Sequence, residues 1–469
     1  MKLIYNVNDK PKLPQLIVFA LQQLLAIMAA TLVVPIIISN PTVPYECGPV
    51  NMSPAAALFG AGVGTLVYLL FTQRKSPVFL GSSFAFLGSM GAAFAGAATV
   101  ALGYLGLILG AILGGLVYVI IAIIVKFAGV NWINKLMPAV VIGPTVALIG
   151  LSLAGNAVGD LQKSDVSASV YVCLLCGLVT LFVTILCATF GKKMVRLIPF
   201  ICGIGAGYVV ALIFTVIGNA CGIDALKVIS FAPFEALLTD GKVAVTTFVD
   251  LPQFTFLNAL GGFKDLNASY ILTLVAAYVP VAFVVFAEHI ADHKNISTII
   301  EKDLLVEPGL HRTLLGDGVG SMAGAIFGGC PNTTYGESVG CVAITGNASI
   351  LTIVAASVGA ILISFVSPFV ALIDSIPPCV MGGVCVALYG FIAVSGLKMI
   401  QGVDLNANNN LFVVSVILIT GIGGLSLSVT IPGLGAITIT TIACSLILGI
   451  ITNIMLNGKK KAAESTEEK

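Results

Sequence analysis

Charged side chains are scarce in this sequence: they make up 9% of its 469 residues, and the formal net charge is only +1. Soluble domains carry about 25% charged residues, so a water-soluble globular protein is excluded. The sequence also lacks a basic patch, which argues against a nucleic-acid partner. Instead, 58% of the residues are apolar, and windows of roughly 17 or more mostly apolar residues recur from end to end. The chain is therefore expected to cross a lipid bilayer many times.

A second CxxC pair and the pattern of a signal peptide are not evident in the sequence either. The eleven cysteines are scattered, mostly within apolar runs, where a thiol packs as a small hydrophobic group. Cys173 and Cys176 form a CxxC pattern without a second pair, which favours packing over a metal or redox centre. The first apolar run begins after Lys12, is too long for a signal-peptide core and has no cleavage-like end, so we expect a retained span.

The apolar runs predict an all-α polytopic membrane protein with fourteen transmembrane spans. The expected spans are 14–39, 54–72, 77–88, 97–126, 136–154, 168–190, 196–219, 267–288, 312–329, 330–344, 348–373, 377–397, 410–425 and 432–456. The third and tenth are short and rich in glycine, serine and threonine. We therefore expect these two spans to be interrupted rather than whole helices.

The distribution of positive charge orients these spans. With a cytoplasmic N-terminus, eighteen of the 22 lysines and arginines fall on the inner side and four on the outer side. This is the bias that the positive-inside rule describes, and it puts both chain termini in the cytoplasm. The long connection 220–266 then lies outside the cell.

A repeat inside the chain indicates inverted symmetry. "PAVVIGPTVALIG" at 138–150 and "PCVMGGVCVALYG" at 378–390 share seven of thirteen positions, and the copies are seven spans apart. "SSFAF" (82–86) and "TTYGE" (333–337) form a weaker pair at the same spacing. Since seven is odd, the copies run in opposite directions, so we expect two inverted seven-span repeats. Such transporters hold their substrate where the interrupted spans of the two halves face each other.

Two glutamates are the best candidates for buried carboxylates. Glu288 lies at the inner part of the eighth span and Glu337 within the tenth. Acids inside a membrane are costly and therefore usually functional. A carboxylate accepts hydrogen bonds from N–H donors, and Phe84 and Tyr335 on the interrupted spans could cover the faces of a flat ring. The residues alone predict a pocket for a small, planar, neutral, N–H-bearing solute, with packing as the alternative role for each side chain.

The segment after Glu288 carries further ionisable groups. Asp292 lies one helical turn on, so the two acids repel when both are charged and could share one proton. His289 and His293 have the i, i+4 spacing of metal ligands, but a third ligand cluster is not evident. The sequence therefore favours proton coupling at Glu288 and Asp292, with no metal, over a membrane metalloenzyme at His289, Asp292 and His293.

With these residues in view, the chain resembles the nucleobase–ascorbate transporter family over nearly its whole length, and within it the uracil-carrying bacterial members. The family signature is matched from Glu337-Ser338-Val339-Gly340 to Thr345-Gly346, with Ser338 in place of the usual asparagine. "PNTTYGE", "AEHIADH" and "GSSFAF" resemble the motifs of the pyrimidine-type members. Asp292 falls where the family pattern has a histidine, and Gln23 where relatives often have one.

The resemblance implies a division into a core domain and a gate domain, usually in a homodimer. Its segments are an N-terminal segment (1–13), core (14–135 and 267–375), gate (136–219 and 376–456), an extracellular loop (220–266) and a cytoplasmic tail (457–469). The core holds spans 1–4 and 8–11, and the gate holds spans 5–7 and 12–14.

The resemblance also implies a function and a binding site. Proton-coupled symport of uracil, or of a similar planar nucleobase, into the cell by alternating access across the cytoplasmic membrane is expected, with no cofactor besides the proton. The implied substrate-binding residues are Glu288, Glu337, Phe84, Gly336, Tyr335, Ala30 and Tyr389. A purine or xanthine carrier of the same family is the alternative, whereas an anion carrier is disfavoured because the pocket offers acids and no buried arginine or lysine.

Overall fold

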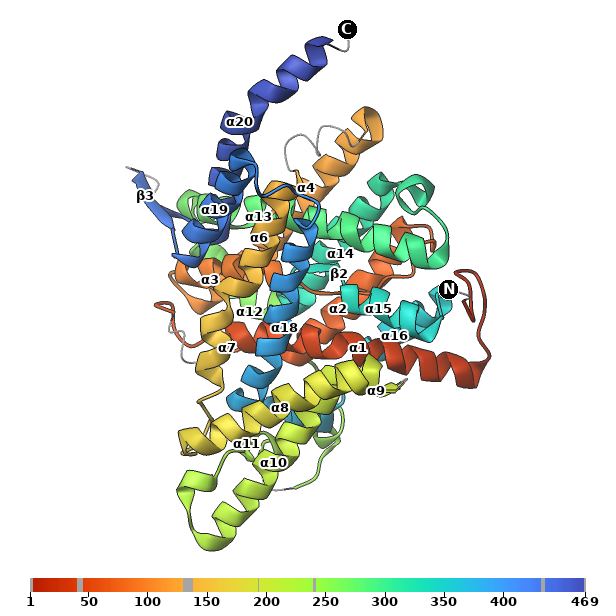
Figure 1. Cartoon of the computed structure of the whole chain (residues 1–469). Helices are drawn as coiled ribbons and strands as arrows, with labels where there is room; N and C mark the ends of the chain where they lie inside the picture. Colours follow the sequence, from red (N-terminus) through yellow and green to blue (C-terminus); the bar gives the residue numbers. More distant parts are fainter. Residues whose placement is uncertain are drawn as a thin grey trace.

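The computed structural model describes residues 3–39, 45–129, 138–192, 194–238, 242–431 and 435–467, and it is almost wholly α-helical (Figure 1). Within these ranges eight helical segments are long and apolar enough to cross a membrane. They are α1 (Leu13–Ile38), α2 (Pro54–Phe71), α4 (Val100–Ala128), α6 with α7 (Ala139–Ser152 and Ala154–Asp160), α8 (Val170–Phe190), α10 (Pro199–Cys221), α13 (Ala268–Ile300) and α18 (Pro378–Met399). The full count of fourteen spans remains a prediction.

Several of these helices have capping residues at their ends. Ser53, Thr99 and Asn267 precede α2, α4 and α13, and each side chain accepts a hydrogen bond from a backbone N–H of the first turn. Gly129 follows α4 with a φ of 71°, a conformation that glycine adopts without strain. Local sequence therefore specifies these boundaries before any tertiary packing.

One group of helices packs around α2 and α14 (Leu310–Gly328). It comprises α1, α2, α4, α13, α14, α15 (Gly336–Thr345) and α16 (Ile350–Ile363). Glycines let the backbones of α2 and α14 touch: a Cβ on Gly64 would lie 2.7 Å from the carbonyl oxygen of Gly320. Close approach without side chains is a common way to pack helices in a bilayer.

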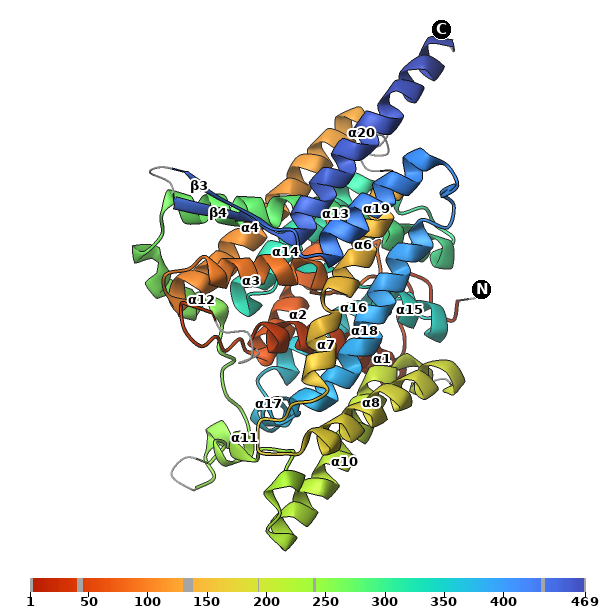
Figure 2. The same cartoon turned by 60° about the vertical axis from the view of Figure 1, so that its left-hand side comes forward.

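A second group of helices lies beside the first. It comprises α6, α7, α8, α10, α18, α19 (Asn408–Ile422) and α20 (Thr441–Glu467). In Figures 1 and 2, α8 and α10 run together along the lower edge, while α20 projects at the top. The family resemblance implies that these helices form the gate and the other group the core, and that division stays a prediction.

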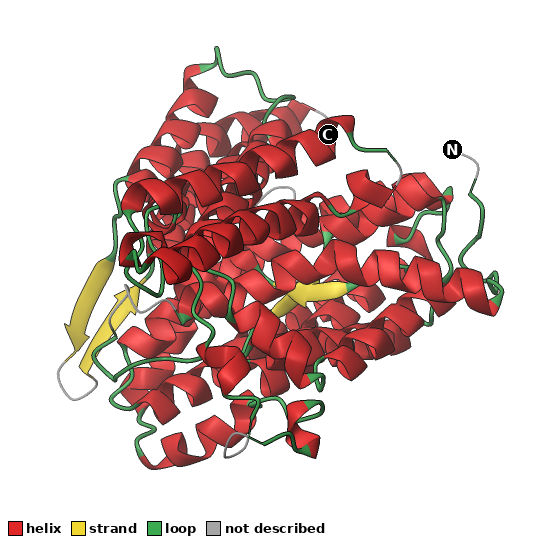
Figure 3. Cartoon of the chain, turned by 90° about the horizontal axis from the view of Figure 1, so that it is seen from below, coloured by secondary structure: helices red, strands yellow, loops and turns green. Residues whose placement is uncertain are grey.

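Neither predicted interrupted span forms a whole helix. The third contains strand β1 (Leu80–Ser82), a turn η1 (Phe84–Phe86) and helix α3 (Leu87–Ala95). The tenth contains strand β2 (Asn332–Thr334) followed by α15. The two strands pair antiparallel amid the helices (Figure 3), with Gly81 opposite Thr333. Each broken backbone thus satisfies part of the other's hydrogen bonding.

Three boundaries differ from the sequence-based expectation. Helix α13 continues to Ile300, so Glu288 lies inside a 33-residue helix rather than at a span end. The eleventh span is divided into α16 and α17 (Ser367–Asp374), because the backbone of Phe365 and Ser367 bonds to residues 248 and 250 of the connection between α10 and α13. The fourteenth begins as strand β4 (Gly435–Ile439), paired with β3 (Leu427–Ile431), and its helix starts only at Thr441.

The remaining elements are short. They are α9 (Met194–Leu197), η2 (Asp224–Leu226), α11 (Ala232–Glu235), η3 (Val245–Thr247), α12 (Thr255–Ala259), η4 (Leu260–Lys264) and η5 (Leu305–Gly309). Five of them, from η2 to η4, lie within the long connection between α10 and α13, which is therefore folded over the ends of the helices.

Candidate functional site

The crossing of β1 and β2 opens onto a cavity of about 400 Å³. Two further hydrogen bonds extend the strand pairing at its ends, Ser83 N to Pro331 O (2.9 Å) and Tyr335 N to Phe79 O (3.2 Å). Beyond the strands, η1 and α15 begin at Phe84 and Gly336. The first N–H groups of a helix have no partner within it, so both helix starts present donors at the crossing.

The cavity lies between this crossing, the middle of α13, and helices α6 and α18 of the second group. Its lining residues are Ser83, Phe84, Ala85, Val146, Ile149, Phe200, Glu288, Ala291, Asp292, Asn295, Thr333, Thr334, Tyr335, Gly336, Glu337, Leu388, Phe391, Ile392, Ser395 and Met399. The structure thus brings together six of the residues singled out from the sequence: Glu288, Glu337, Phe84, Gly336, Tyr335 and Asp292.

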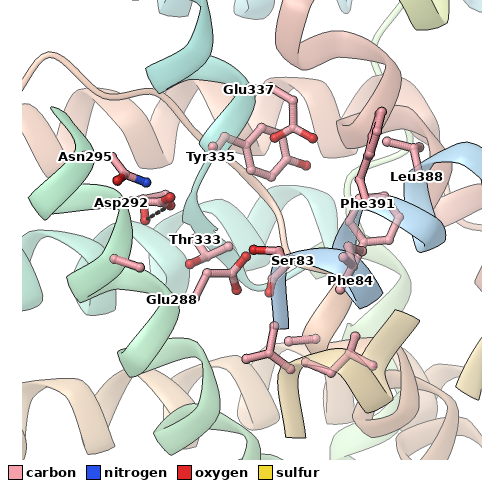
Figure 4. Close-up of a pocket in the computed structure, with 18 of the residues that line it drawn as sticks. Ser83, Phe84, Glu288, Asp292, Asn295, Thr333, Tyr335, Glu337, Leu388 and Phe391 are labelled. Atoms are coloured by element: carbon pink, nitrogen blue, oxygen red, sulfur yellow. Dashed lines mark hydrogen bonds between the residues drawn. The ribbon is translucent and has the colours of Figure 1, made fainter. Parts of the chain in front are cut away.

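The two glutamates enter the cavity from different elements. Glu288 projects from α13, and Glu337 from the first turn of α15 (Figure 4). Both residues are partly buried, and both line the cavity. Together they offer carboxylate acceptors along two sides of a small space, an arrangement suited to a ligand with more than one N–H donor.

Asp292 lies deeper, one turn beyond Glu288 on α13. Asp292 is only 8% exposed, and Thr334 Oγ1 donates a hydrogen bond of 2.9 Å to the Asp292 Oδ2. This contact connects α13 to β2 (Figure 4). Asp292 is therefore not a solvated residue at a helix end, which was one reading of the sequence.

Two aromatic rings border the cavity. The Tyr335 hydroxyl donates to Ser82 O (2.7 Å), which attaches β2 to β1. A Cβ on Gly81 would overlap the Tyr335 ring, so the glycine leaves room for it. The Phe84 ring packs edge-on against Tyr389, with centroids 6.2 Å apart and planes at 77°.

The other two residues predicted to bind substrate lie behind Tyr335 and Phe84. Ala30 of α1 is buried in the same apolar cluster as Tyr335, and Tyr389 of α18 is 3% exposed behind Phe84. Neither lines the cavity. From α18, it is Leu388 and Phe391 that reach the surface.

The sequence-based reasoning missed several lining residues, notably Ser83, Thr333, Asn295 and Phe391. Asn295 follows Asp292 on the cavity side of α13 (Figure 4). Helical spacing was the available signal, because Asn295 lies three residues after Asp292 and seven after Glu288. This signal could be used only if α13 was expected to continue past residue 288.

His289 and His293 do not line the cavity. His289 Nδ1 lies 2.7 Å from Asp317 Oδ2 and its Nε2 lies 3.0 Å from Thr313 Oγ1. His293 Nδ1 donates to His289 O, and its Nε2 lies 2.7 Å from the Tyr68 hydroxyl. Every ring nitrogen is thus engaged in a hydrogen bond. Among the described residues, no group of three histidine, cysteine or acidic side chains could hold a metal ion.

Ser338, at the position where the family pattern has an asparagine, holds helix α15 in place. Its Oγ accepts a hydrogen bond of 2.9 Å from Phe79 N and another from the Gln23 side chain of α1. Gln23 and Ser338, two of the three positions at which the sequence differs from the family pattern that it resembles, are therefore direct partners.

The amino-acid sequence is similar to known permeases over nearly the whole chain. The sequence profile described as "Permease family" matches residues 14–430. The uracil permease of Bacillus caldolyticus is 38% identical over 470 residues, covering 100% of this chain and 98% of that protein. The uracil permeases of Bacillus subtilis (strain 168) and Escherichia coli (strain K12) are 37% and 35% identical, covering 100% and 95% of this chain and 98% and 94% of those proteins.

Solved structures share the fold at low sequence identity. SLC26A9 superposes with a TM-score of 0.62 and 12% identity, over 95% of this chain and 66% of that one. The transmembrane domain of the cyanobacterial bicarbonate transporter BicA gives a TM-score of 0.58 and 14% identity, over 96% and 100%. These likenesses establish a mostly helical membrane transporter fold.

Proposed function

The chain belongs to the permease family of nucleobase–ascorbate transporters, and from that premise we propose that it carries uracil into the cell in symport with protons. Its relatives are permeases and not enzymes, so the metalloenzyme alternative is set aside. The observation that carries the proposal is the convergence of Glu288 and Glu337 on one cavity.

The shape and polarity of the cavity suit a pyrimidine-dione. Uracil carries two N–H donors, which two carboxylates can accept, and two carbonyl oxygens, which the N–H groups at Phe84 and Gly336 can approach. Phe84 and Tyr335 supply aromatic surface for the ring. In this scheme Ala30 and Tyr389 act indirectly. Ala30 helps to fix the position of Tyr335, and Tyr389 that of Phe84.

Protons enter the scheme through Glu288 and Asp292. Two acids one helical turn apart in a low-dielectric site repel when both are ionised, so at least one favours its neutral form. In our proposal Glu288 is protonated from outside as uracil binds, and loses its proton on the inner side as uracil leaves. Thr334 holds Asp292 in place beside it.

The position of the cavity between two packing groups supports alternating access. We propose that residues 14–135 and 267–375 move as a core against a gate of 136–219 and 376–456, as inverted repeats of seven spans each. We further propose that the protein lies in the cytoplasmic membrane as a homodimer, with both chain termini in the cytoplasm.

The test is uracil-driven proton uptake. Proteoliposomes containing the purified chain, in weakly buffered medium, should alkalinise the outer medium when uracil is added, and a protonophore should abolish the signal. Uptake of labelled uracil without a pH change would contradict proton symport. No uptake at all would contradict the proposed substrate.

Substrate choice is tested by competition. Unlabelled thymine, xanthine and hypoxanthine are added to labelled-uracil uptake assays. Strong inhibition by xanthine or hypoxanthine, at concentrations where uracil itself competes, would favour the purine carrier instead.

A further inference from the structure

Four consecutive polar side chains lie at the strand crossing, and one of them lacks a partner. Asn332 Nδ2 donates to Gly60 O (3.1 Å), Thr334 donates to Asp292, and Tyr335 donates to Ser82 O. Thr333, the central residue of β2, is only 3% exposed, and its Oγ1 has no hydrogen-bond partner among the described residues. Leaving a buried hydroxyl unpaired is unfavourable, so a partner that arrives later is the natural expectation.

The position of this hydroxyl indicates what that partner is. Thr333 lines the cavity, and in Figure 4 it lies between Asp292 and Ser83, close to Glu288. The other buried hydroxyls without a partner in the described part of the chain, those of Ser82, Tyr118 and Tyr278, do not line this cavity. Thr333 is thus distinguished both by its free hydroxyl and by its location.

The chemistry of the cavity leaves a role for a donor at this point. The two carboxyl groups already face the N–H edges of the proposed substrate, where the ionised Glu337 and the carbonyl oxygen of the protonated Glu288 accept. A pyrimidine-dione also presents two carbonyl oxygens, and each has two lone pairs, so a carbonyl that accepts from a backbone N–H at Phe84 or Gly336 can accept a second hydrogen bond. A threonine hydroxyl donates one hydrogen bond and can rotate to do so.

We propose that Thr333 Oγ1 donates a hydrogen bond to a ring carbonyl oxygen of the nucleobase, and thereby selects for a dione. This inference rests on the proposed function, and it adds a specificity-determining residue that acts directly on the substrate. A cavity that hydrogen-bonds a substrate group discriminates strongly against analogues that lack it.

The experiment compares inhibition constants in proteoliposomes. Uracil, 2-thiouracil and 4-thiouracil compete against labelled uracil for the wild type, Thr333→Val and Thr333→Ser. Sulfur is a weak acceptor, so replacing the bonded carbonyl oxygen weakens this contact while the ring keeps both of its N–H donors. For Thr333→Val we expect the uracil constant to rise on the order of tenfold, while the constant for one thiouracil stays at its wild-type value. Thr333→Ser should keep the wild-type pattern.

A matched control is Thr145→Val. The Thr145 hydroxyl is buried and bonds only to Val141 O of its own helix α6, and Thr145 does not line the cavity. This variant should leave all three inhibition constants unchanged. If Thr333→Val does not fold, as judged by size-exclusion elution, Thr333→Ala replaces it in the comparison with Thr333→Ser.

The outcomes separate this inference from the proposed function. Saturable wild-type uptake of uracil, together with equal losses for all three competitors in Thr333→Val, or no loss at all, would overturn the role of Thr333 alone. Equal losses with an altered pH profile would mean that Thr333 acts through Glu288, which also overturns it. Absence of wild-type uracil uptake would overturn both.

Discussion

Glu288 and Glu337 face one cavity from unlike surroundings. Glu337 stands in the first turn of α15, where the partial positive charge of the helix start favours an ionised carboxylate. Glu288 lies in the middle of α13 and has no such support. This difference indicates separate roles, in which Glu337 is a permanent hydrogen-bond acceptor and Glu288 carries the proton that is exchanged.

Substituting each glutamate by glutamine tests that division. Glu337→Gln should lose uracil binding, since the amide cannot act as an acceptor at both of its positions. Glu288→Gln, which resembles the protonated acid, should retain binding but lose the pH dependence of uptake. Binding is measured by isothermal titration calorimetry, and uptake across a pH series in proteoliposomes.

The pair of variants also exposes an error in the site. If both transport uracil normally, the cavity at the strand crossing is not the substrate site. If Glu288→Gln loses binding as completely as Glu337→Gln, the two roles are not separate.

The acids of the site could be predicted from the sequence because ionised groups are rare in apolar spans. Thr333 and Asn295 could not, since hydroxyl and amide side chains are common in such segments. Which of them faces a cavity depends on the direction of β2 and on the length of α13. Both properties arise from pairing with distant residues.

At the scale of the element, the crossing of α2 and α14 positions β2. Gly324 lies against Gly60 and against the amide of Asn332, the first residue of β2. Gly324→Ala would place a methyl group on that amide. We expect a loss of about 1–3 kcal/mol in stability, from overpacking, together with weaker uracil binding. Thermal unfolding in detergent and binding titration measure the two effects.

Gly205→Ala is the matched control for this substitution. Gly205 lies on an exposed face of α10, and an added Cβ would meet nothing within 4 Å. There alanine should leave stability unchanged or raise it by up to about 1 kcal/mol, because it lowers the entropy of the unfolded chain. If Gly324→Ala behaves in the same way, the crossing tolerates expansion and does not control the site.

Element boundaries show where sequence reasoning ends. Apolar length and the Gly/Ser/Thr content were enough to find the long helices and the two interrupted spans. The division between α16 and α17 was not predictable, because it depends on backbone bonds to residues 248 and 250 in a loop far along the chain. The β3–β4 pair was missed because an apolar run of that length fits a strand pair and a helix equally well.

At the scale of the whole molecule, the contact between α1 and α18 should change during transport. Val33 of α1 and Cys385 of α18 belong to one apolar cluster where the two packing groups meet. Introducing Val33→Cys, with the other native cysteines replaced by serine, leaves one thiol on each of the two helices in this cluster. Oxidation or Hg²⁺ should then arrest uracil uptake, and dithiothreitol should restore it.

The control is the same cysteine background with Val33 retained, which should be insensitive to both treatments. A linked protein, identified by its mass, that still transports uracil at the normal rate would show that the two groups do not move against each other here.

The pairing of Leu80–Ser82 with Asn332–Thr334 also has a consequence for biosynthesis. A ribosome finishes the first strand long before it makes the second, so the early half of the chain must wait in the bilayer with strand groups unpaired. Neither half can complete its own binding surface. Cutting the gene in the long connection between α10 and α13 should therefore give two fragments that are inert when produced singly and regain activity only when made in the same cell.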